Sequence, residues 1–220
     1  RRQSRRPIIR AETAPATRLL FVRHASHDLL NKVLVGRMPD VPISAAGVEE
    51  AHRVAARLAE IGITRVHTSP RQRAVETALI IARATRVPMQ ISFALDEIDL
   101  GAWTGLSFEE LANEPSWSFW NMLRSLARPP EGECMREVQE RMVAAVEAMA
   151  AAHPDASVLA VSHNLASKAL LCHALGIPLA AFRRIHVDLA SYAEIEVRSG
   201  EPWTVNRMNE RCHLPGLLPT

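Results

Sequence analysis

The chain of 220 residues is poor in cysteine and has no long apolar run. Its cysteines, Cys134, Cys172 and Cys212, are odd in number and lack Cys-x-x-Cys spacing. This pattern argues against a disulfide framework and a structural zinc site, so we expect buried, reduced thiols in a cytoplasmic protein. No apolar stretch approaches the roughly 18 residues that a membrane-spanning helix needs, so no membrane association is predicted.

Strong charge of one sign is also missing. The formal net charge is only +2, which argues against a surface built to bind nucleic acid. Arginine is concentrated at the N-terminus, where prolines accompany it, and residues 1–16 are predicted to be a disordered basic leader. A solvated tail is the favoured interpretation of this leader over a nucleic-acid or membrane arm. No apolar core of a secretory signal follows it.

Internal repeats are absent, and we find no low-complexity tract after the leader. The hydrophobic content of 48% and the charged content of 23% are ordinary for a soluble globular protein. A chain of this length buries a full core as one unit. Residues 17–220 are therefore predicted to form a single domain.

Strand and helix patterns alternate along this domain. Two apolar runs, 19–22 and 158–161, predict buried strands. The remaining expected elements are helices at 45–61, 69–84, 115–126, 133–152 and 164–175, strands at 64–68 and 87–93, and a hairpin of 191–197 with 203–208. The pattern predicts an α/β fold: a three-layer α/β/α sandwich with a mostly parallel central sheet and an antiparallel edge strand. An insert at about 103–130 is expected to form a lid.

Each of the two buried strands is followed by a histidine, His24 and His163. Ligands of open α/β sheets bind at the carboxyl ends of the strands, so these histidines are expected at one site. The neighbouring charge of Arg23 disfavours a protonated His24 ring. A neutral imidazole can act as a nucleophile, and such a site suits an anionic electrophile such as phosphate.

A third segment begins the helix expected at 69–84. Ser69 is predicted as its N-cap and Pro70 as its first residue. Arg71 and Arg73 lie in this first turn, where acidic residues are usual, so an external anion is expected to compensate them. Arg73 is the favoured ligand of that anion. His163 is expected to donate a hydrogen bond to a phosphoryl oxygen.

A carboxyl group near bound phosphate could protonate the leaving oxygen. Asp96, Glu97 and Asp99 are all candidates, and the residue pattern does not separate them. His24 and His27 are three residues apart but have no carboxylate or cysteine at metal-ligand spacing. We therefore expect no metal and no cofactor.

These segments, in this order, resemble motifs of the histidine phosphatase superfamily, also called phosphoglycerate-mutase-like. The matching segments are Arg23-His24-Ala25, 69–77, 97–105 and 161–164. The resemblance covers about residues 18–214 and favours the short phosphatase branch. It implies that Arg73 binds phosphate and that Glu97 is the general acid.

The chain departs from the family pattern around these motifs. Ala25 and Asn164 stand where glycine is usual, and Ser26-His27-Asp28 replaces the more common Glu-Thr. Asn31 lies one position later in the chain than the asparagine of the family pattern. Because this region usually shapes the substrate pocket, the resemblance makes His27, Asn31 and Arg37 candidate substrate contacts and adds Asn164 to the phosphate ligands.

The resemblance implies a two-step phosphoryl transfer. His24 attacks phosphorus, Glu97 protonates the departing alcohol, and water then hydrolyses the phosphohistidine. Arg23, Arg73 and His163 hold the nonbridging oxygens. The implied activity is that of a metal-independent phosphomonoester hydrolase.

Three alternatives remain open at this point. A mutase would return the phosphoryl group to a bound intermediate, and a binding module would keep the pocket without turnover. His24-Ala25-Ser26 and His67-Thr68-Ser69 also resemble paired elements of a 2H phosphoesterase, but that interpretation leaves Arg73, Glu97 and His163 unexplained.

The expected partner is a phosphorylated small molecule. Sugar phosphates, a nucleotide-loop phosphate of cobalamin synthesis and phosphoproteins all fit the residues. The oligomeric state is left open.

Overall fold

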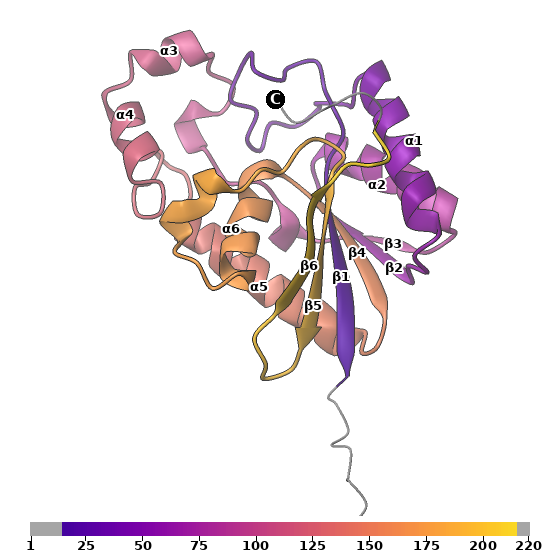
Figure 1. The fold of residues 1–220 in the computed structure, drawn as a ribbon. Helices are drawn as coiled ribbons and strands as arrows, with labels where there is room; N and C mark the ends of the chain where they lie inside the picture. Colours follow the sequence, from indigo (N-terminus) through magenta and orange to yellow (C-terminus); the bar gives the residue numbers. More distant parts are fainter. Residues whose placement is uncertain (1–14, 215–220) are drawn as a thin grey trace, which may run out of the picture.

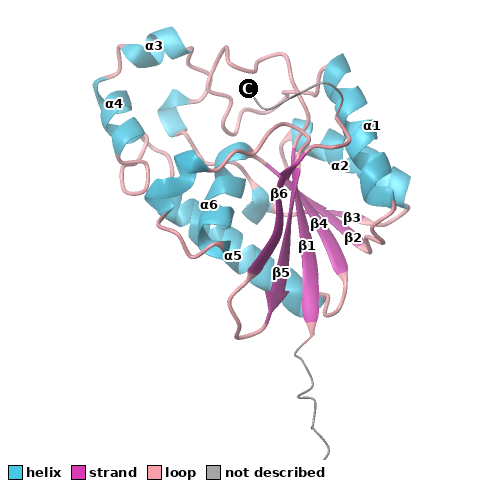
Figure 2. Ribbon diagram, in the orientation of Figure 1, coloured by secondary structure: helices cyan, strands magenta, loops and turns pink. Residues whose placement is uncertain are grey.

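The computed structural model describes residues 15–214 and places a six-stranded sheet between two layers of helices (Figures 1 and 2). The strands are β1 (Ala16–Arg23), β2 (Arg65–Thr68), β3 (Met89–Ile91), β4 (Ser157–Ser162), β5 (Tyr192–Arg198) and β6 (Thr204–Glu210). Their order is β3-β2-β4-β1-β5-β6. β5 pairs antiparallel with both β1 and β6, and the other pairs are parallel. This confirms the predicted fold class.

Helices cover both faces of the sheet. They are α1 (Ala45–Ala59), α2 (Gln72–Thr85), α3 (Phe108–Ala112), α4 (Pro115–Met122), α5 (Met135–Ala152), α6 (Asn164–Ala174) and the 3₁₀ turns η1 (Phe93–Leu95), η2 (Gly101–Trp103) and η3 (Leu179–Arg184). One core cluster joins α1 and α2 to the sheet, and the other joins α5 and α6 to its opposite face. No helix among residues 15–214 is long and apolar enough to cross a bilayer.

The central position of β1 explains its apolar run. Leu19 and Phe21 pack in the core beneath α5 and α6, whereas Leu20 and Val22 pack beneath α1 and α2. Side chains of a strand alternate between faces, so a strand covered on both sides is apolar throughout. The run ends at Arg23, where the strand reaches the edge of the sheet.

The loop after β1 is anchored to α1. The Ser26 amide and hydroxyl donate to the Glu50 carboxylate, and the Ser44 amide donates to the Ser26 carbonyl at 2.8 Å. A Cβ on Gly47 would lie 2.2 Å from the Ser26 oxygen, so only glycine permits this approach. These contacts hold the chain rigidly just beyond His24.

All the expected elements form, but the start of α2 was wrongly predicted. The helix begins at Gln72, after Arg71 at the N-cap position, and no side chain caps it. The Ser69 hydroxyl accepts from the amide of Arg71, one residue before the helix, at 3.3 Å. It also donates to Asp96 and accepts from His163. Ser69 therefore belongs to the site.

The insert at 103–130 carries α3 and α4. Trp103, Trp117 and Trp120 pack together with ring centroids 5.2–5.6 Å apart, and Trp120 is 1% exposed. Trp103 and Trp120 belong to the core, and Trp117 packs against it partly buried. The capping box that begins α3 at Ser107 is present. A lid function for the insert stays a prediction.

The basic leader lies almost entirely outside the described residues. The description begins at Pro15, and β1 begins at Ala16, the last residue assigned to the leader.

Candidate active site

The register of two parallel strands brings His24 and His163 together. Arg23 at the end of β1 pairs with Ser162 at the end of β4, so the residues that follow are neighbours. The two imidazole centroids are 5.1 Å apart, and the His24 amide donates to the Ser162 carbonyl. Both rings are buried.

The contacts of His24 define which of its nitrogens is free to react. Nδ1 lies 2.9 Å from the Ala25 carbonyl oxygen, which can only accept, so Nδ1 carries the proton. The lone pair is then on Nε2. Burial, followed by the charges of Arg73 and Arg23, lowers the His24 pKa well below its usual value. The ring is therefore neutral at pH 7, the form that a nucleophile needs.

Two arginines place unpaired N–H donors beside this ring. Arg23 donates to the Val187 carbonyl, but its Nε is buried without a partner. Arg73 donates to the Gly36 carbonyl, and its Nε and Nη1 are buried without partners. Burial lowers the Arg73 pKa to about 10, although the Glu97 charge opposes the shift. Buried donors of this kind are costly unless an acceptor reaches them, and an anion would supply it.

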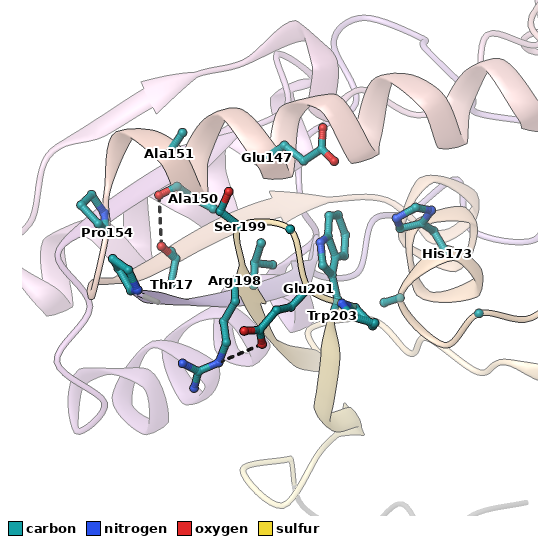
Figure 3. Close-up of a pocket in the computed structure, with 16 residues that line it drawn as sticks. Thr17, Glu147, Ala150, Ala151, Pro154, His173, Arg198, Ser199, Glu201 and Trp203 are labelled. Carbon is teal, nitrogen blue, oxygen red and sulfur yellow. Dashed lines mark hydrogen bonds and ion pairs between the residues drawn. The ribbon is translucent and has the colours of Figure 1, made fainter. Parts of the chain in front are cut away.

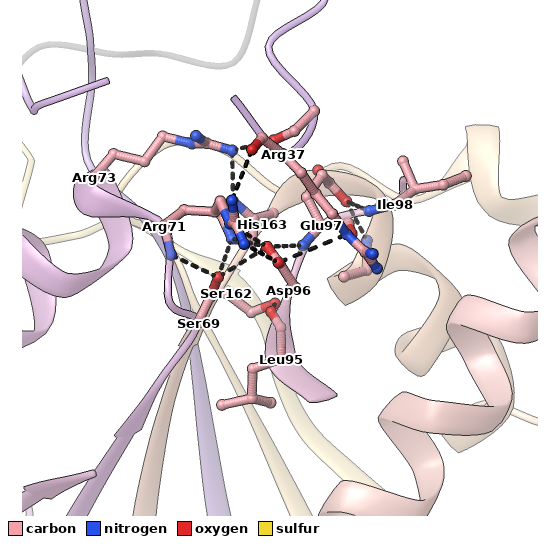
Figure 4. A network of polar contacts seen from close by, with 12 residues as sticks. Arg37, Ser69, Arg71, Arg73, Leu95, Asp96, Glu97, Ile98, Ser162 and His163 are labelled. Carbon is pink, nitrogen blue, oxygen red and sulfur yellow. Dashed lines mark hydrogen bonds and ion pairs between the residues drawn. The ribbon is translucent and has the colours of Figure 1, made fainter. Parts of the chain in front are cut away.

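His163 belongs to a chain of buried hydrogen bonds (Figure 4). Arg73 Nη2 lies 3.2 Å from His163 Nδ1, so Nδ1 accepts and Nε2 donates to the Ser69 hydroxyl at 2.7 Å. That hydroxyl donates to Asp96 Oδ1 at 3.2 Å. The chain fixes the orientation of His163 and ties it to Arg73. The sequence predicted no role for Ser69 beyond a helix cap.

The three acidic residues after η1 have different surroundings. Asp96 accepts from Arg71 and Ser69, and Asp99 accepts from Arg37. Only Glu97 among the three lines the cavity that contains His24.

The Glu97 carboxylate is held by the start of α6. It accepts from the amides of Ile98 and Ala166 at 3.0 Å and from the Leu165 amide at 3.2 Å. Its position is therefore set by backbone groups, which carry no net charge.

The cavity has a volume of about 170 Å³. Of the predicted site residues it is lined by Arg23, His24, His27, Asn31, Arg73, Glu97 and Asn164. His27 Nδ1 and Asn164 Oδ1 are buried without partners, and Asn31 is exposed at the rim with a φ of 59°. The remaining lining is apolar and comes from Leu29, Leu30, Val33, Leu34, Val35, Gly36, Ile98, Leu100, Phe108 and Leu165.

Arg37 does not lie with these residues. Its guanidinium donates to the Glu97 carbonyl, to Asp99 and to Glu133 at 2.8–3.2 Å. The structure thus places this candidate substrate contact behind Glu97, where it braces the backbone of the acidic segment.

A larger cavity of about 780 Å³ lies at the opposite end of β1 (Figure 3). Thr17 near the start of the strand lines it, together with Trp203 and His173, whose rings are 4.8 Å apart. None of the predicted site residues lines this cavity.

The geometry also bears on the 2H phosphoesterase interpretation and on metal binding. His67 lies beside His153 in a different cavity from His24, so the paired elements of a 2H phosphoesterase are not assembled. Within the part of the chain that is described, no group of three or more His, Cys, Asp or Glu side chains is arranged to hold a metal ion.

Comparison with known proteins identifies the family. The model of the histidine phosphatase superfamily (branch 1) matches residues 19–211. The "Probable phosphoglycerate mutase GpmB" of Proteus mirabilis is 32% identical over 196 residues, which are 84% of this chain and 87% of that protein. The chain therefore belongs to the histidine phosphatase superfamily, which confirms the resemblance drawn from its motifs.

Two further relatives differ in what they share with the chain. A bifunctional protein of Mycobacterium tuberculosis is 32% identical over 200 residues, 90% of this chain but 55% of that protein. The chain thus spans about half the length of some curated relatives. The structure of mycobacterial glucosyl-3-phosphoglycerate phosphatase superposes with a TM-score of 0.81 over 89% of this chain and 100% of that one. At 24% identity, it shows a common fold.

We expect the free protein to lose stability as the pH falls below neutrality. The pKa values of His24 and His163 lie well below normal because of burial, and burial and Arg73 lower that of His27 to about 4. Below pH 6.5 the unfolded chain binds protons that the folded chain does not, so the free energy of unfolding decreases by up to about 1.4 kcal/mol per pH unit per histidine. Denaturant unfolding at several pH values between 7 and 4 measures this slope.

The variant His27→Asn isolates one contribution. Between pH 6.5 and about 4, the free energy of unfolding of this variant is expected to change less steeply with pH than that of the unmodified protein. Equal slopes would show that His27 is not held neutral in the folded state.

Proposed function

We propose that this protein is a phosphomonoester hydrolase that acts through a phosphohistidine on His24. One observation carries the proposal. A neutral histidine with its lone pair on Nε2 lines the same cavity as two arginines whose buried N–H donors lack protein acceptors. A phosphate group would satisfy those donors and present its phosphorus to the histidine.

The proposed mechanism assigns one task to each group. Nε2 of His24 forms a bond to phosphorus while the ester oxygen leaves and takes a proton from Glu97. Arg23, Arg73 and Asn164 hold the nonbridging oxygens. The predicted hydrogen bond from His163 to phosphate is replaced by a positioning role, because its two ring nitrogens contact Arg73 and Ser69. Water then attacks the phosphohistidine, Glu97 removes its proton, and His24 and inorganic phosphate are regenerated.

The positive charge for this reaction comes from the side chains themselves. Arg23 and Arg73 compensate the phosphate charge, which supports turnover without a metal ion. Hydrogen bonds to charged groups contribute about 1.5–3 kcal/mol each, so these arginines are the main anchors of the phosphate.

A mutase activity is the second candidate, and the named mutase relative favours it. The apolar lining beyond the phosphate ligands favours hydrolysis. It includes Leu30, Val33 and Phe108, which offer no charge to a carboxylate beside the phosphate, the arrangement found in phosphoglycerate.

Steady-state assays test the proposal. We expect phosphate release from an aryl phosphate in the presence of EDTA, and inhibition by vanadate, which mimics pentacoordinate phosphorus. Turnover that requires an added metal ion would contradict the metal-independent mechanism. Binding of phosphate esters without any turnover would identify a binding module instead. Isomerisation of 3-phosphoglycerate faster than phosphate release would identify a mutase.

A further inference from the structure

Another pocket, of about 370 Å³, lies between α4 and η3. We call it the α4–η3 pocket. Its polar lining comes from Ser118, Asn121, Arg124, Ser125 and Arg183, and Phe182 supplies an aromatic wall. In Figure 1, α4 lies beside the segment that follows α6. The lining includes two cations and no carboxylate.

The two guanidinium groups share a neutral partner. Arg124 Nη2 donates to the Asn121 side-chain oxygen, and Arg183 Nη2 donates to the Asn121 carbonyl. Their Cζ atoms lie 5.5 and 6.0 Å from the Phe182 ring centroid. Within residues 15–214, no carboxylate lies within 4 Å of either group. Two positive charges are therefore close together without a counter-charge.

Arg124 is the more deeply placed of the two. Its Cζ lies 4.1 Å over the Trp120 ring, and its Nε is buried without a partner. Burial and the nearby charge of Arg183 lower the Arg124 pKa to about 10. A desolvated cation next to a like charge is unfavourable, and a bound anion would compensate both.

Lys168 is a third cation in this part of the protein. It lies on α6, one turn after Asn164, which lines that cavity. Burial and then the charges of Arg23 and Arg124 lower the Lys168 pKa, so this side chain lies within electrostatic range of both sites.

The backbone limits the distance between the α4–η3 pocket and the catalytic cavity. Arg183 is four residues before Val187, whose carbonyl accepts from Arg23 Nη1 at 2.7 Å. The Cα atoms of Arg183 and Val187 are therefore at most about 14 Å apart, to which the side chains add their own length. A single elongated ligand can reach from the phosphate site to this pocket.

We propose that the α4–η3 pocket binds a second anionic group, a phosphate or a carboxylate, of the substrate whose phosphate ester is cleaved at His24. This inference rests on the proposed function and names its substrate class: a phosphomonoester with a remote anion. Arg124 and Arg183 bind that anion, and the serine hydroxyls of the pocket supply further donors. A free inorganic anion has the same chemistry and is the other source to be tested.

The test compares alkanediol bisphosphates of about four to about twelve carbons with the monophosphates of the same alcohols. The measured quantity is the ratio of kcat/KM for the bisphosphate to that for the monophosphate. Loss of one charge-assisted contact in Arg183→Met is expected to lower this ratio about tenfold at the optimal chain length. Arg184→Met is the matched control, because Arg184 is exposed and does not line the pocket, and its ratio should stay unchanged.

Each outcome decides between the alternatives. An equal ratio in Arg183→Met and the unmodified protein would overturn the proposal. The proposal would also be overturned if Arg183→Met kept the kcat/KM ratio but lost a binding site for inorganic phosphate in calorimetry. The pocket would then bind a free anion and not part of the substrate. Absence of turnover with both the bisphosphates and the monophosphates would refute the proposed hydrolase. The anion pocket would still be supported if Arg183→Met bound the bisphosphate more weakly in calorimetry but bound the monophosphate unchanged.

Discussion

Replacement of His24 by alanine is expected to reduce kcat/KM for an aryl phosphate by at least about 10³-fold, or about 4 kcal/mol of activation free energy. The physical reason is that no other group in the cavity combines a free lone pair with the same position. His27 is neutral too, but its ring centroid is 5.4 Å from that of His24, and His163 uses both ring nitrogens for Arg73 and Ser69. Initial rates at saturating and limiting substrate measure the loss.

Two controls accompany this variant. His173→Ala removes a histidine from the larger cavity at the other end of β1 and should retain full activity. Binding of inorganic phosphate to His24→Ala should persist, because Arg23 and Arg73 are intact. A His24→Ala protein that turns over at the unmodified rate would refute the assignment of the nucleophile.

Replacement of Glu97 by glutamine is expected to slow hydrolysis of an alkyl phosphate by about 10²–10⁴-fold, the usual contribution of a general acid. A nitrophenyl phosphate should be affected much less, because nitrophenolate leaves readily without a proton. The rate of phosphate release from the two esters, compared as a ratio, measures this dependence on the leaving group.

The substitution also has a structural cost that must be separated from catalysis. The glutamine oxygen can accept from Ile98 and Ala166 as Glu97 Oε1 does, but its NH₂ group then faces the Leu165 amide. An unpaired buried donor costs about 1–3 kcal/mol, so Tm is recorded alongside the rates.

Asp99→Asn is the matched control for Glu97→Gln. Asp99 lies two residues away, outside the cavity, so its loss should leave the ratio between the two esters unchanged. Equal loss across both esters in Glu97→Gln would argue that the residue holds α6 and donates no proton.

Much of the fold follows from local pattern. A strand apolar on both faces must be covered on both sides, and β1 and β4 satisfy this rule in the centre of the sheet. Because both strands end at the same edge, the position of His24 beside His163 also follows from the pattern. The antiparallel edge was predictable from the Ser199-Gly200 turn between two β-rich runs.

The remaining features depend on contacts between segments far apart in the chain. Ser69 looks like an ordinary helix cap until tertiary packing places Asp96 and His163 next to its hydroxyl. The family resemblance makes Arg37 a candidate substrate contact, but Asp99 and Glu133 bind it behind the cavity. Sequence spacing carries no information about either approach.

The general acid could not be chosen among the three acidic residues from the residue pattern. The pattern left Asp96, Glu97 and Asp99 equal, and only the family resemblance assigned the acid to Glu97. In the structure the backbone amides of α6 hold this carboxylate at the cavity, whereas its two neighbours pair with arginines. The α4–η3 pocket had no signal in the sequence, because Arg124 and Arg183 are brought together only by packing of the insert against η3.

Chemical identification of the phosphorylated residue tests the central claim most directly. The protein is mixed with a phosphate ester, quenched in alkali within the first turnover, and digested for peptide mass spectrometry. The account predicts a phosphoryl group on the peptide that contains His24, stable in alkali, lost in acid, and absent from His24→Ala. Phosphate release with no phosphorylated peptide at any quench time, or a phosphoryl group on another residue, would contradict it.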